Sequence, residues 1–502
     1  MLSATVCLLT IALCLSGGFH QGYIANVLNQ PYVAIEQFIN QSWIERYNNS
    51  IKPNNLNLIW SALNVLFPIA GIFGQFLAAV LCHNFGRKQT AIISSLLYFP
   101  GIGLSFATKQ YRPHFELLFI GRFIWSLANG ILTVTATVWI VECVPTKHRG
   151  RMASLQEVFM AAGSLSCQIA GMMFSTEELW PNIFIPPIII SLIAVAIFSL
   201  THDSPQFIID HKQDVEKARN ALVFYHGGSD NSEKIDAELK VCLESLVEKS
   251  QKHTEHTSKK VTHLSSLTVM FKPAKADDPK SQVIRTAAWL GVLIKIAYVL
   301  TGSRCLRAYS TFVLHHMSKW DLSTALILSC CIGFMRLPFT FVPVILVEKV
   351  GRRPLIIGSM LMSLIAQIVL IGCIHFGSEW KIGSFIALTT LLLVNACGLG
   401  SVSRFYSAEL VPRSLLINSV SLLTAAEGIT KVTIEFAFFP IAHINEAYSL
   451  LLFAIPTAVL TMVVWYFCPE TKGKAVNDVL NTIAQRQKIK ATFANDKIPV
   501  KI

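Results

Sequence analysis

The chain has 502 residues, of which 53% are hydrophobic and only 14% are charged. Soluble globular proteins carry about 25% charged residues, and the mean hydropathy of +0.51 lies far toward the apolar side. The composition excludes a soluble protein, and with it a nucleic-acid-binding protein or a small disulfide-stapled secreted fold.

Apolar residues gather in runs of about 20, the length that an α-helix needs to cross the core of a bilayer. No basic segment precedes the first run, so we interpret it as a retained helix rather than a cleaved signal peptide. The sequence predicts an all-α integral membrane protein with twelve transmembrane helices. They are expected at residues 4–24, 57–81, 89–107, 115–142, 152–175, 181–201, 284–316, 322–347, 354–376, 382–410, 415–440 and 447–467.

The distribution of positive charge predicts the orientation, because Lys and Arg favour the cytoplasmic side of a membrane. Most of the 42 Lys and Arg residues fall in the loops after even-numbered spans, in the central loop and in the C-terminal tail. Both termini are therefore predicted to be cytoplasmic, and the loop 25–56 extracellular. That loop holds two Asn-x-Ser sequons, at Asn40 and Asn48, which are candidate glycosylation sites with Asn40 the favoured one.

Short motifs recur in the two halves of the chain. Gly86-Arg87-Lys88 is repeated as Gly351-Arg352-Arg353, and the Glu-x-Val-Pro sequence that begins at Glu142 is repeated at Glu409. Such repeats predict two pseudo-symmetric six-helix bundles around a site at the membrane midplane. The expected domains are an N-terminal bundle 1–201, a cytoplasmic linker with short helices 202–283, a C-terminal bundle 284–467 and a cytoplasmic tail 468–502.

Further motifs stand at the ends of the predicted spans. Gly121-Arg122-Phe123 opens the fourth, Asp203-Ser204-Pro205 follows the sixth, and Pro469-Glu470-Thr471-Lys472-Gly473 follows the twelfth. Together with the repeats, they make nearly the whole chain resemble the sugar-porter branch of the major facilitator superfamily, most closely the animal facilitative glucose transporters. The resemblance implies the major facilitator fold and transport of a small polar solute by alternating access.

The charged residues of the repeated motifs form a candidate cytoplasmic gate. Ion pairs among them would tie the two bundles together while the cavity faces outward, and would have to break before it faces inward. The alternative is ordinary positive charge on solvated cytoplasmic loops. The candidate gate residues are Arg87, Lys88, Glu142, Arg149, Glu348, Arg352, Arg353, Glu409 and Arg413.

The resemblance also indicates a divergent substrate pocket. Glu157 replaces a glutamine that sugar porters use in the fifth span, and Arg336 replaces an asparagine of the eighth. The tenth-span motif becomes Gly398-Leu399-Gly400-Ser401-Val402-Ser403-Arg404 and loses its hinge prolines and its tryptophan, whereas the hexose-contacting amide Gln168 is retained. The candidate substrate-binding residues are Glu157, Gln168, Tyr298, Thr301, Arg304, Arg336 and Arg404.

Cations inside predicted spans concentrate in the C-terminal half. They are Lys295, Arg304, Arg307, Arg336, Arg404 and Lys431. Arginine suits carboxylates and phosphates, so these residues would favour an anionic solute. Alternatively, Glu157, Glu427 and Glu435 neutralise them in structural pairs, or the cations extend to the membrane surface.

The sequence favours a uniporter for a hexose or related polyol in the plasma membrane. An organic-anion or sugar-acid transporter is one alternative, and a receptor or scaffold that has lost transport is another. Proton-driven sugar porters carry an aspartate where this chain has Ile24, which favours facilitated diffusion. We find no catalytic motif, metal site or cofactor motif, so we expect that the chain is not an enzyme. The expected partners are therefore a small-molecule solute and the lipid bilayer.

Overall fold

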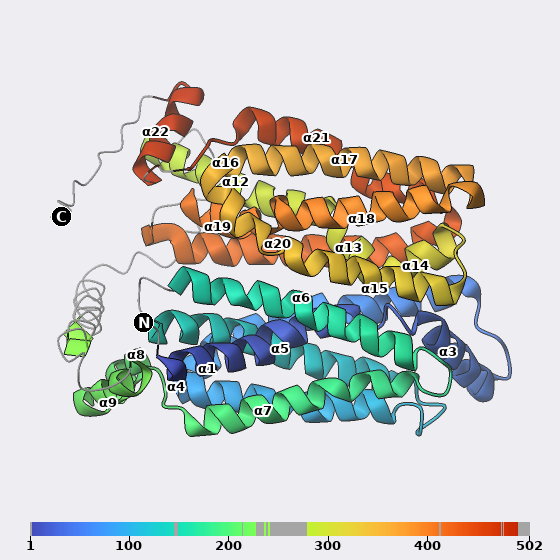
Figure 1. Cartoon of the computed structure of the whole chain (residues 1–502), viewed down its shortest axis with the longest axis horizontal. Coiled ribbons are helices and arrows are strands. Elements are labelled where there is room, and N and C mark those ends of the chain that lie inside the picture. Colours follow the sequence, from blue (N-terminus) through green and yellow to red (C-terminus); the bar gives the residue numbers. More distant parts are fainter. Residues whose placement is uncertain are drawn as a thin grey trace. The chain divides into compact units, whose positions relative to one another are not determined.

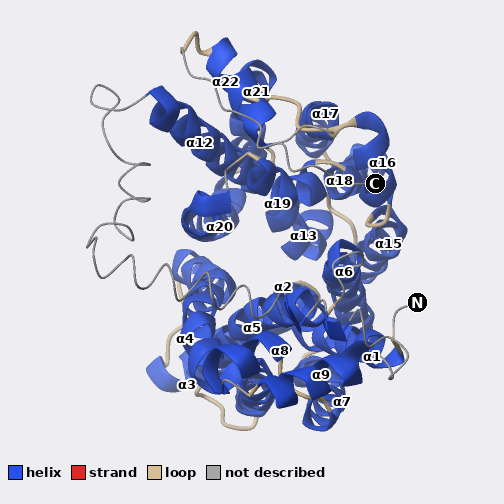
Figure 2. Ribbon diagram, turned by 90° about the vertical axis from the view of Figure 1, so that its left-hand side faces the viewer, coloured by secondary structure: helices blue, strands red, loops and turns tan. Residues whose placement is uncertain are grey.

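The computed structural model describes residues 3–144, 149–212, 214–226, 235–236, 239–240, 279–410, 413–472, 474 and 476–489. Within these ranges the side chains of some helical residues also lie outside the description. Four of the candidate site residues are among them: Arg149, Glu348, Arg404 and Arg413. Every regular element in the described part of the chain is helical (Figure 2), so the predicted all-α fold is confirmed.

Ten helices of the described residues are long and apolar enough to cross a membrane. One of them, α4 (Pro53–Ala107), contains two predicted spans, which are separated at Gly86 by a non-helical backbone with φ 85° and ψ 176°. The predicted span at 415–440 lies within another helix, α20 (Arg413–Ile444). All twelve predicted spans therefore lie on helices of the structure.

The chain divides into two compact units, and unit 1 comprises Met1–Ser258 and Leu322–Leu337. Its first helix, blue in Figure 1, continues through a π-helical turn, η1, into α2, so that one predicted span is made of three pieces. Besides α4, its elements are α1 (Ala4–Leu13), η1 (Cys14–Phe19), α2 (His20–Asn26), α3 (Tyr32–Tyr47), α5 (Glu116–Cys143), α6 (Arg149–Phe174), η2 (Trp180–Phe184), α7 (Pro186–Leu200), α8 (Pro205–Phe207), η3 (Ile208–Lys212), α9 (Val215–His226) and most of α15 (Leu322–Phe339).

Glycines bring the helices of unit 1 into backbone contact. A Cβ atom added at Gly22 of α2 would lie 1.9 Å from the carbonyl oxygen of Met160 on α6. One added at Gly163 of α6 would lie 2.0 Å from the carbonyl oxygen of Phe19. Small residues at such contacts are typical of membrane helices, which gain stability by close packing because lipid already solvates their apolar side chains.

Unit 2 comprises Lys259–Asp321 and Pro338–Ile502. In it α17 packs along α18, and α12 packs against α19 and α20. Besides α20, its elements are α12 (Pro279–Leu300), α13 (Ser303–Ala308), α14 (Ser310–Phe312), η5 (Val313–Met317), α16 (Val342–Val350), α17 (Arg352–Phe376), η6 (Ser378–Trp380), α18 (Lys381–Cys397), α19 (Leu399–Glu409), η7 (Tyr448–Leu450), α21 (Leu451–Phe467) and α22 (Val476–Arg486).

Two features of the helices differ from the predicted pattern. Three predicted spans are each divided between separate helices. The spans 284–316 and 382–410 are interrupted at Gly302 and Gly398, and the span 322–347 is interrupted between α15 and α16. In addition, the larger part of α15 clusters with unit 1, although its place in the sequence suggested the C-terminal bundle. The hydrophobic pattern finds the spans, but it does not find where the backbone within a span leaves the helix.

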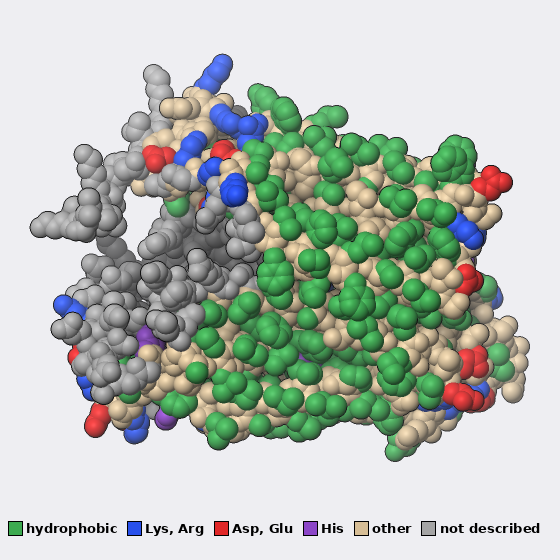
Figure 3. All heavy atoms as spheres, in the orientation of Figure 1, with side chains coloured by type: hydrophobic (Ala, Val, Ile, Leu, Met, Phe, Trp, Pro, Cys, Tyr) green, Lys and Arg blue, Asp and Glu red, His purple; other side chains and the backbone are tan. Residues whose placement is uncertain are grey.

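The surface matches a membrane environment. On the face shown in Figure 3, hydrophobic side chains cover the middle stretch of the helices, while Lys, Arg, Asp and Glu gather toward the helix ends. Many of the large exposed side chains on these helices are apolar, such as Phe76, Ile189 and Met462. Water would not tolerate so extensive an apolar surface, whereas the acyl chains of a bilayer would.

Candidate functional site

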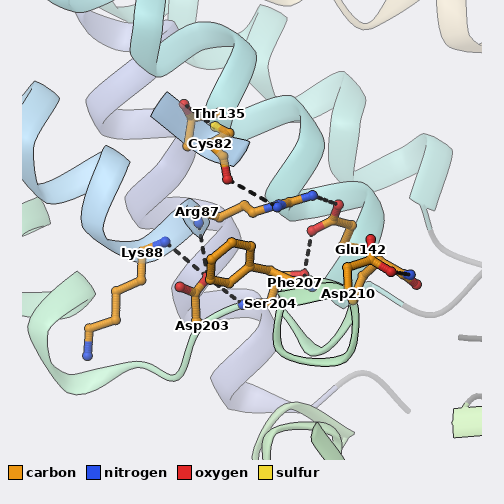
Figure 4. Close-up of polar contacts among 10 residues, drawn as sticks. Cys82, Arg87, Lys88, Thr135, Glu142, Asp203, Ser204, Phe207 and Asp210 are labelled. Carbon is orange, nitrogen blue, oxygen red and sulfur yellow. Dashed lines mark hydrogen bonds and ion pairs between the residues drawn. The ribbon is translucent and has the colours of Figure 1, made fainter. Parts of the chain in front are cut away.

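One charged cluster, drawn in Figure 4, joins helix ends of unit 1. The Arg87 guanidinium contacts the Glu142 carboxylate at 2.6 Å and donates to the carbonyl oxygen of Cys82 at 3.3 Å. The hydroxyl of Ser204 donates to the other Glu142 oxygen. Both charged side chains are only 14% exposed, so each depends on the other for its charge to be tolerated.

The backbone turn before Arg87 is held by a second carboxylate. Asp203 Oδ1 accepts from the backbone N–H of Arg87 at 3.0 Å and of Lys88 at 3.2 Å. The φ of Gly86 is 85°, and a Cβ there would lie 2.3 Å from Asp203 Oδ2, so only glycine fits this turn. The Lys88 ammonium group donates to the carbonyl oxygens of Ser199 and Thr201 at the end of α7.

Unit 2 repeats this arrangement. Arg352 contacts Glu409 at 3.0 Å, and the hydroxyl of Thr471 donates to the other Glu409 oxygen at 2.5 Å. Glu470 accepts from the backbone N–H groups of Arg352 at 2.9 Å and Arg353 at 3.0 Å. The preceding Gly351 has a φ of 102°. We call the two clusters the unit 1 brace (Arg87, Glu142, Asp203, Ser204) and the unit 2 brace (Arg352, Glu409, Glu470, Thr471).

The environment of Glu470 keeps its carboxylate charged. Partial burial raises its pKa, but backbone N–H groups, those of Lys472, Arg352, Arg353 and Thr471, together outweigh burial and hold the pKa below its ordinary value. Hydrogen bonds donated to a carboxylate stabilise its ionised form. The Glu470 carboxylate is therefore ionised at neutral pH.

The braces change the interpretation of the predicted gate. The sequence analysis expected ion pairs that tie the two bundles together, but Arg87–Glu142 lies inside unit 1 and Arg352–Glu409 inside unit 2. Arg353 donates to the carbonyl oxygen of Trp465, again within its own unit. The side chains of Arg149, Glu348 and Arg413 lie outside the described residues.

The break in the seventh predicted span is surrounded by polar groups of unit 2. α12 ends at Leu300, and Gly302 has a φ of 69°. Gln367 Nε2 donates to the carbonyl oxygen of Thr301 at 2.8 Å, and Asn395 Nδ2 donates to its hydroxyl at 2.9 Å. The same hydroxyl donates to the carbonyl oxygen of Tyr298 at 2.7 Å. Two candidate residues, Tyr298 and Thr301, thus belong to one hydrogen-bonded group with two amides that the sequence analysis missed.

The cations of unit 2 are paired with carboxylates. Arg304 Nε lies 3.4 Å from Glu435, and Lys295 lies 3.3 Å from Glu427. Lys431 contacts the other oxygen of Glu427 from the next turn of α20. Each of the five side chains is at most 15% exposed. Of the three alternatives for these cations, the arrangement favours structural pairing for Lys295, Arg304 and Lys431.

We expect Glu427→Gln to destabilise unit 2, because Lys295 and Lys431 would then face each other without a shared carboxylate. Removing one partner of a buried ion pair costs about 3–5 kcal/mol. Thermal unfolding of the detergent-purified protein measures the loss. The double variant Glu427→Gln/Lys431→Met removes one cation with the carboxylate and should recover part of it. If the double variant loses as much stability as the two single variants lose together, this account is contradicted.

The remaining candidate pocket residues are distributed over both units. Gln168 is buried on α6, and its Nε2 donates to the hydroxyl of Ser329 on α15 at 3.4 Å. Asn29 Nδ2 approaches the same hydroxyl at 3.5 Å. Glu157 of α6 and Arg336 of α15 are half-buried, and the side chain of Arg404 lies outside the described residues.

The amides around Gln168 were missed by the sequence analysis. Asn26 Nδ2 donates to the hydroxyl of Ser164 at 2.9 Å, and Asn26 is 1% exposed. A signal was present, since Asn26, Asn29 and Gln30 are polar residues at helical spacing directly after an apolar run. Asn26 fell into the predicted loop 25–56 because α2 extends beyond the predicted end of the span at residue 24, and Asn29 and Gln30 lie in the turn that follows α2.

The tenth predicted span is interrupted although it lacks the prolines. Gly398 has φ −116° and ψ −108°, which ends α18 and begins α19. The hydroxyl of Ser359 on α17 accepts from the backbone N–H of Leu399 at 2.9 Å. A Cβ at Gly398 would lie 2.2 Å from the Ser359 Cβ, so the glycine is required for the close approach of the two helices. The loss of the proline motif therefore does not produce a continuous helix.

The two sequons differ in accessibility. Asn40 lies within α3, where its Oδ1 accepts from the backbone N–H of Ile51 at 3.2 Å, and Ser42 of the same sequon is buried. Asn48 is exposed at the end of α3 in a left-handed conformation with φ 53°. Attached glycans are bulky and need a surface position, so the structure favours Asn48, the reverse of the order expected from the sequence.

We expect Asn48→Gln to abolish the mobility shift that a glycosidase produces on the protein expressed in animal cells, and Asn40→Gln to leave it unchanged. Gel electrophoresis with and without the glycosidase measures both variants. A shift that survives in Asn48→Gln and disappears in Asn40→Gln would show that the sequon inside α3 is the one modified.

Among the described residues, no group of three or more His, Cys, Asp or Glu side chains could hold a metal ion. The candidate site is thus composed of hydrogen-bonding and charged side chains inside helical units. It offers binding and conformational control.

Comparisons with known proteins agree with this picture. The sequence model described as "Sugar (and other) transporter" matches residues 9–481. The facilitated glucose transporter member 1 of Gallus gallus is 25% identical over 96% of this chain and 94% of its own length, and member 7 of Mus musculus is 24% identical over 97% and 91%. The inward-open xylose transporter XylE from E. coli superposes with a TM-score of 0.73 at 18% identity, over 95% of this chain and 99% of its own.

These findings confirm the predicted fold and the resemblance. The matched family is one of transporters, so the expectation that the chain is not an enzyme is confirmed as well. The twelve helices have the major facilitator fold. This chain belongs to the sugar (and other) transporter family of membrane proteins.

Proposed function

We propose that the chain carries a neutral hexose or related polyol across the plasma membrane by facilitated diffusion, through alternating access to a central site. Both termini, and with them the two braces, would lie on the cytoplasmic side. The names of the relatives cited above support the solute class, since two are facilitated glucose transporters and one is a xylose transporter. Substrate orientation would depend on hydrogen bonds, because neutral sugars need groups that both donate and accept.

The observation that carries the proposal is the presence of a complete brace in both units. Each unit keeps its arginine, its glutamate, its turn glycine and the second carboxylate that holds the turn. A protein that had lost transport would have no need to keep two charged clusters that cost desolvation energy. Buried amides near Gln168 and Thr301 add groups suited to hydroxyl-bearing solutes.

Two alternatives lose support. The anionic-solute alternative relied on cations in the spans, and in unit 2 Arg304, Lys295 and Lys431 contact carboxylates. The receptor alternative relied on the altered amides of the seventh span and on a lost hinge in the tenth, and Gly398 provides a break in the tenth. Ile24 is fully buried where proton-driven sugar porters carry an aspartate, which supports uniport.

Uptake into proteoliposomes tests the proposal. The purified protein should accelerate entry of labelled glucose or fructose above empty vesicles, and a panel of labelled organic anions should not enter faster. For a uniporter, a protonophore should leave the initial rate unchanged, and unlabelled solute trapped inside should drive counterflow. Flux of an organic anion alone would replace the sugar proposal, and binding without any flux would favour the receptor.

A further inference from the structure

A cavity of about 250 Å³ opens in unit 2 where α12, α21 and α22 meet. Its apolar lining comes from Leu290, Phe467 and Ile483. α22 packs against the unit through the buried residues Val479, Leu480, Ile483 and Ala484. The helix thereby forms one wall of the cavity, while α12 and α21 form the others.

The other lining residues are polar or amphipathic. Thr286 and Gln487 form a hydrogen bond to each other, with Thr286 Oγ1 3.3 Å from Gln487 Oε1 and 3.2 Å from Gln487 Nε2. One terminal nitrogen of Arg486 donates to the carbonyl oxygen of Cys468 at 3.2 Å. A guanidinium has five N–H donors, and Arg486 is exposed, so it can also donate to a ligand. The cavity thus combines an apolar wall with a positively charged, hydrogen-bonding group.

The position of the cavity is at the end of a membrane span. α21 ends at Phe467, and its last turn carries Trp465 and Tyr466, which are 60% and 74% exposed. Exposed aromatic residues at the end of a span are typical of the boundary between acyl chains and headgroups. Lys488, just beyond α22, adds a second exposed cation near this boundary. Anionic headgroups attract such basic residues.

We infer that this cavity binds an anionic phospholipid of the leaflet in which α21 ends. One acyl chain would lie against Leu290, Phe467 and Ile483, and the phosphate would accept hydrogen bonds from Arg486. Under the proposed orientation that leaflet is the cytoplasmic one, which is where anionic lipids concentrate. A transported sugar is a poor fit for the apolar wall, and the cavity lies at a helix end rather than along the middle of the spans.

Lipid retention tests the inference. The full chain is purified in detergent from vesicles of equal parts phosphatidylserine and phosphatidylcholine, and its bound lipids are quantified by mass spectrometry. We expect phosphatidylserine to be enriched about threefold over phosphatidylcholine in the wild type and to return to the ratio of the vesicles in Arg486→Gln. Lys474→Gln is the matched control, since it removes an exposed cation from the same segment outside the cavity. Enrichment that persists in Arg486→Gln would overturn the role of the guanidinium.

A second measurement tests where the acyl chain of the bound phospholipid lies. A phosphatidylserine probe with a photoreactive diazirine on its acyl chain should label peptides that contain Leu290 or Ile483. The larger side chain of Ile483→Phe should lower that labelling severalfold, with melting of the purified variant showing that it is folded. Labelling spread evenly over all apolar helix faces would overturn the inference. Neither measurement involves a transported solute, so failure here is distinct from failure of the proposed transport function.

Discussion

Glu142→Gln should reduce the initial rate of solute uptake at least tenfold and lower the melting temperature of the purified protein. The amide cannot neutralise the Arg87 guanidinium, which is 14% exposed and would keep the Cys82 carbonyl oxygen among its few partners. Breaking one side of such a pair costs about 3–5 kcal/mol. The lost interaction energy affects the point where the ends of two spans meet the turn at Gly86. Unit 1 would therefore become less rigid, and it must be rigid in order to move as one body.

Uptake in proteoliposomes and thermal melting measure both effects. Arg87→Gln/Glu142→Gln removes both charges and should recover part of the stability, because no uncompensated charge remains. Glu45→Gln is the matched control. It breaks the Arg112–Glu45 pair at 2.6 Å, whose side chains are 39% and 44% exposed, and exposed pairs contribute about 1 kcal/mol or less. Equal effects of Glu142→Gln and Glu45→Gln would show that the brace has no special role.

Gly163→Ala should strongly destabilise unit 1, although it adds only one methyl group. The new Cβ would lie 2.0 Å from the carbonyl oxygen of Phe19, and backbone atoms cannot move aside as a flexible side chain can. Overpacking a tight contact costs about 1–3 kcal/mol, and more when the backbone must shift. We therefore expect poor expression, early melting and loss of uptake in parallel.

Gly103→Ala provides the comparison. Gly103 also lies inside a helix, but a Cβ there meets nothing within 4 Å. Alanine is favoured over glycine in helices by about 1 kcal/mol, so this variant should be neutral or more stable. Thermal melting of the two variants side by side measures the difference. If both variants melt like the wild type, η1 and α6 are not in backbone contact at this point.

Sequence patterns were sufficient for the fold because membrane spans depend on the lengths of apolar runs. The repeated Gly-Arg motifs and the two Glu-x-Val-Pro motifs also located the braces, since their residue types and spacing fit a turn with an ion pair. The partners Asp203 and Glu470 stood in motifs that the sequence analysis quoted, but no local pattern shows that their oxygens accept from backbone N–H groups far away in the chain.

The candidate pocket was less predictable. Whether Arg304 contacts a solute or Glu435 depends on how α13 packs beside α20, and the sequence left both alternatives open. The hinge at Gly398 was expected to be lost because the prolines are lost. The structure shows that the helix is nevertheless interrupted at Gly398, opposite Ser359, whose hydroxyl accepts a hydrogen bond from the backbone N–H of Leu399. Tertiary contacts of this kind produce no periodic pattern in the amino-acid sequence.

All residues of the unit 1 brace, from Arg87 to Ser204, precede the central segment of the chain. Domains at the start of a chain can fold while the remainder is still being synthesised. The ion pair and hydrogen bonds of the unit 1 brace can therefore form before the ribosome has made α12.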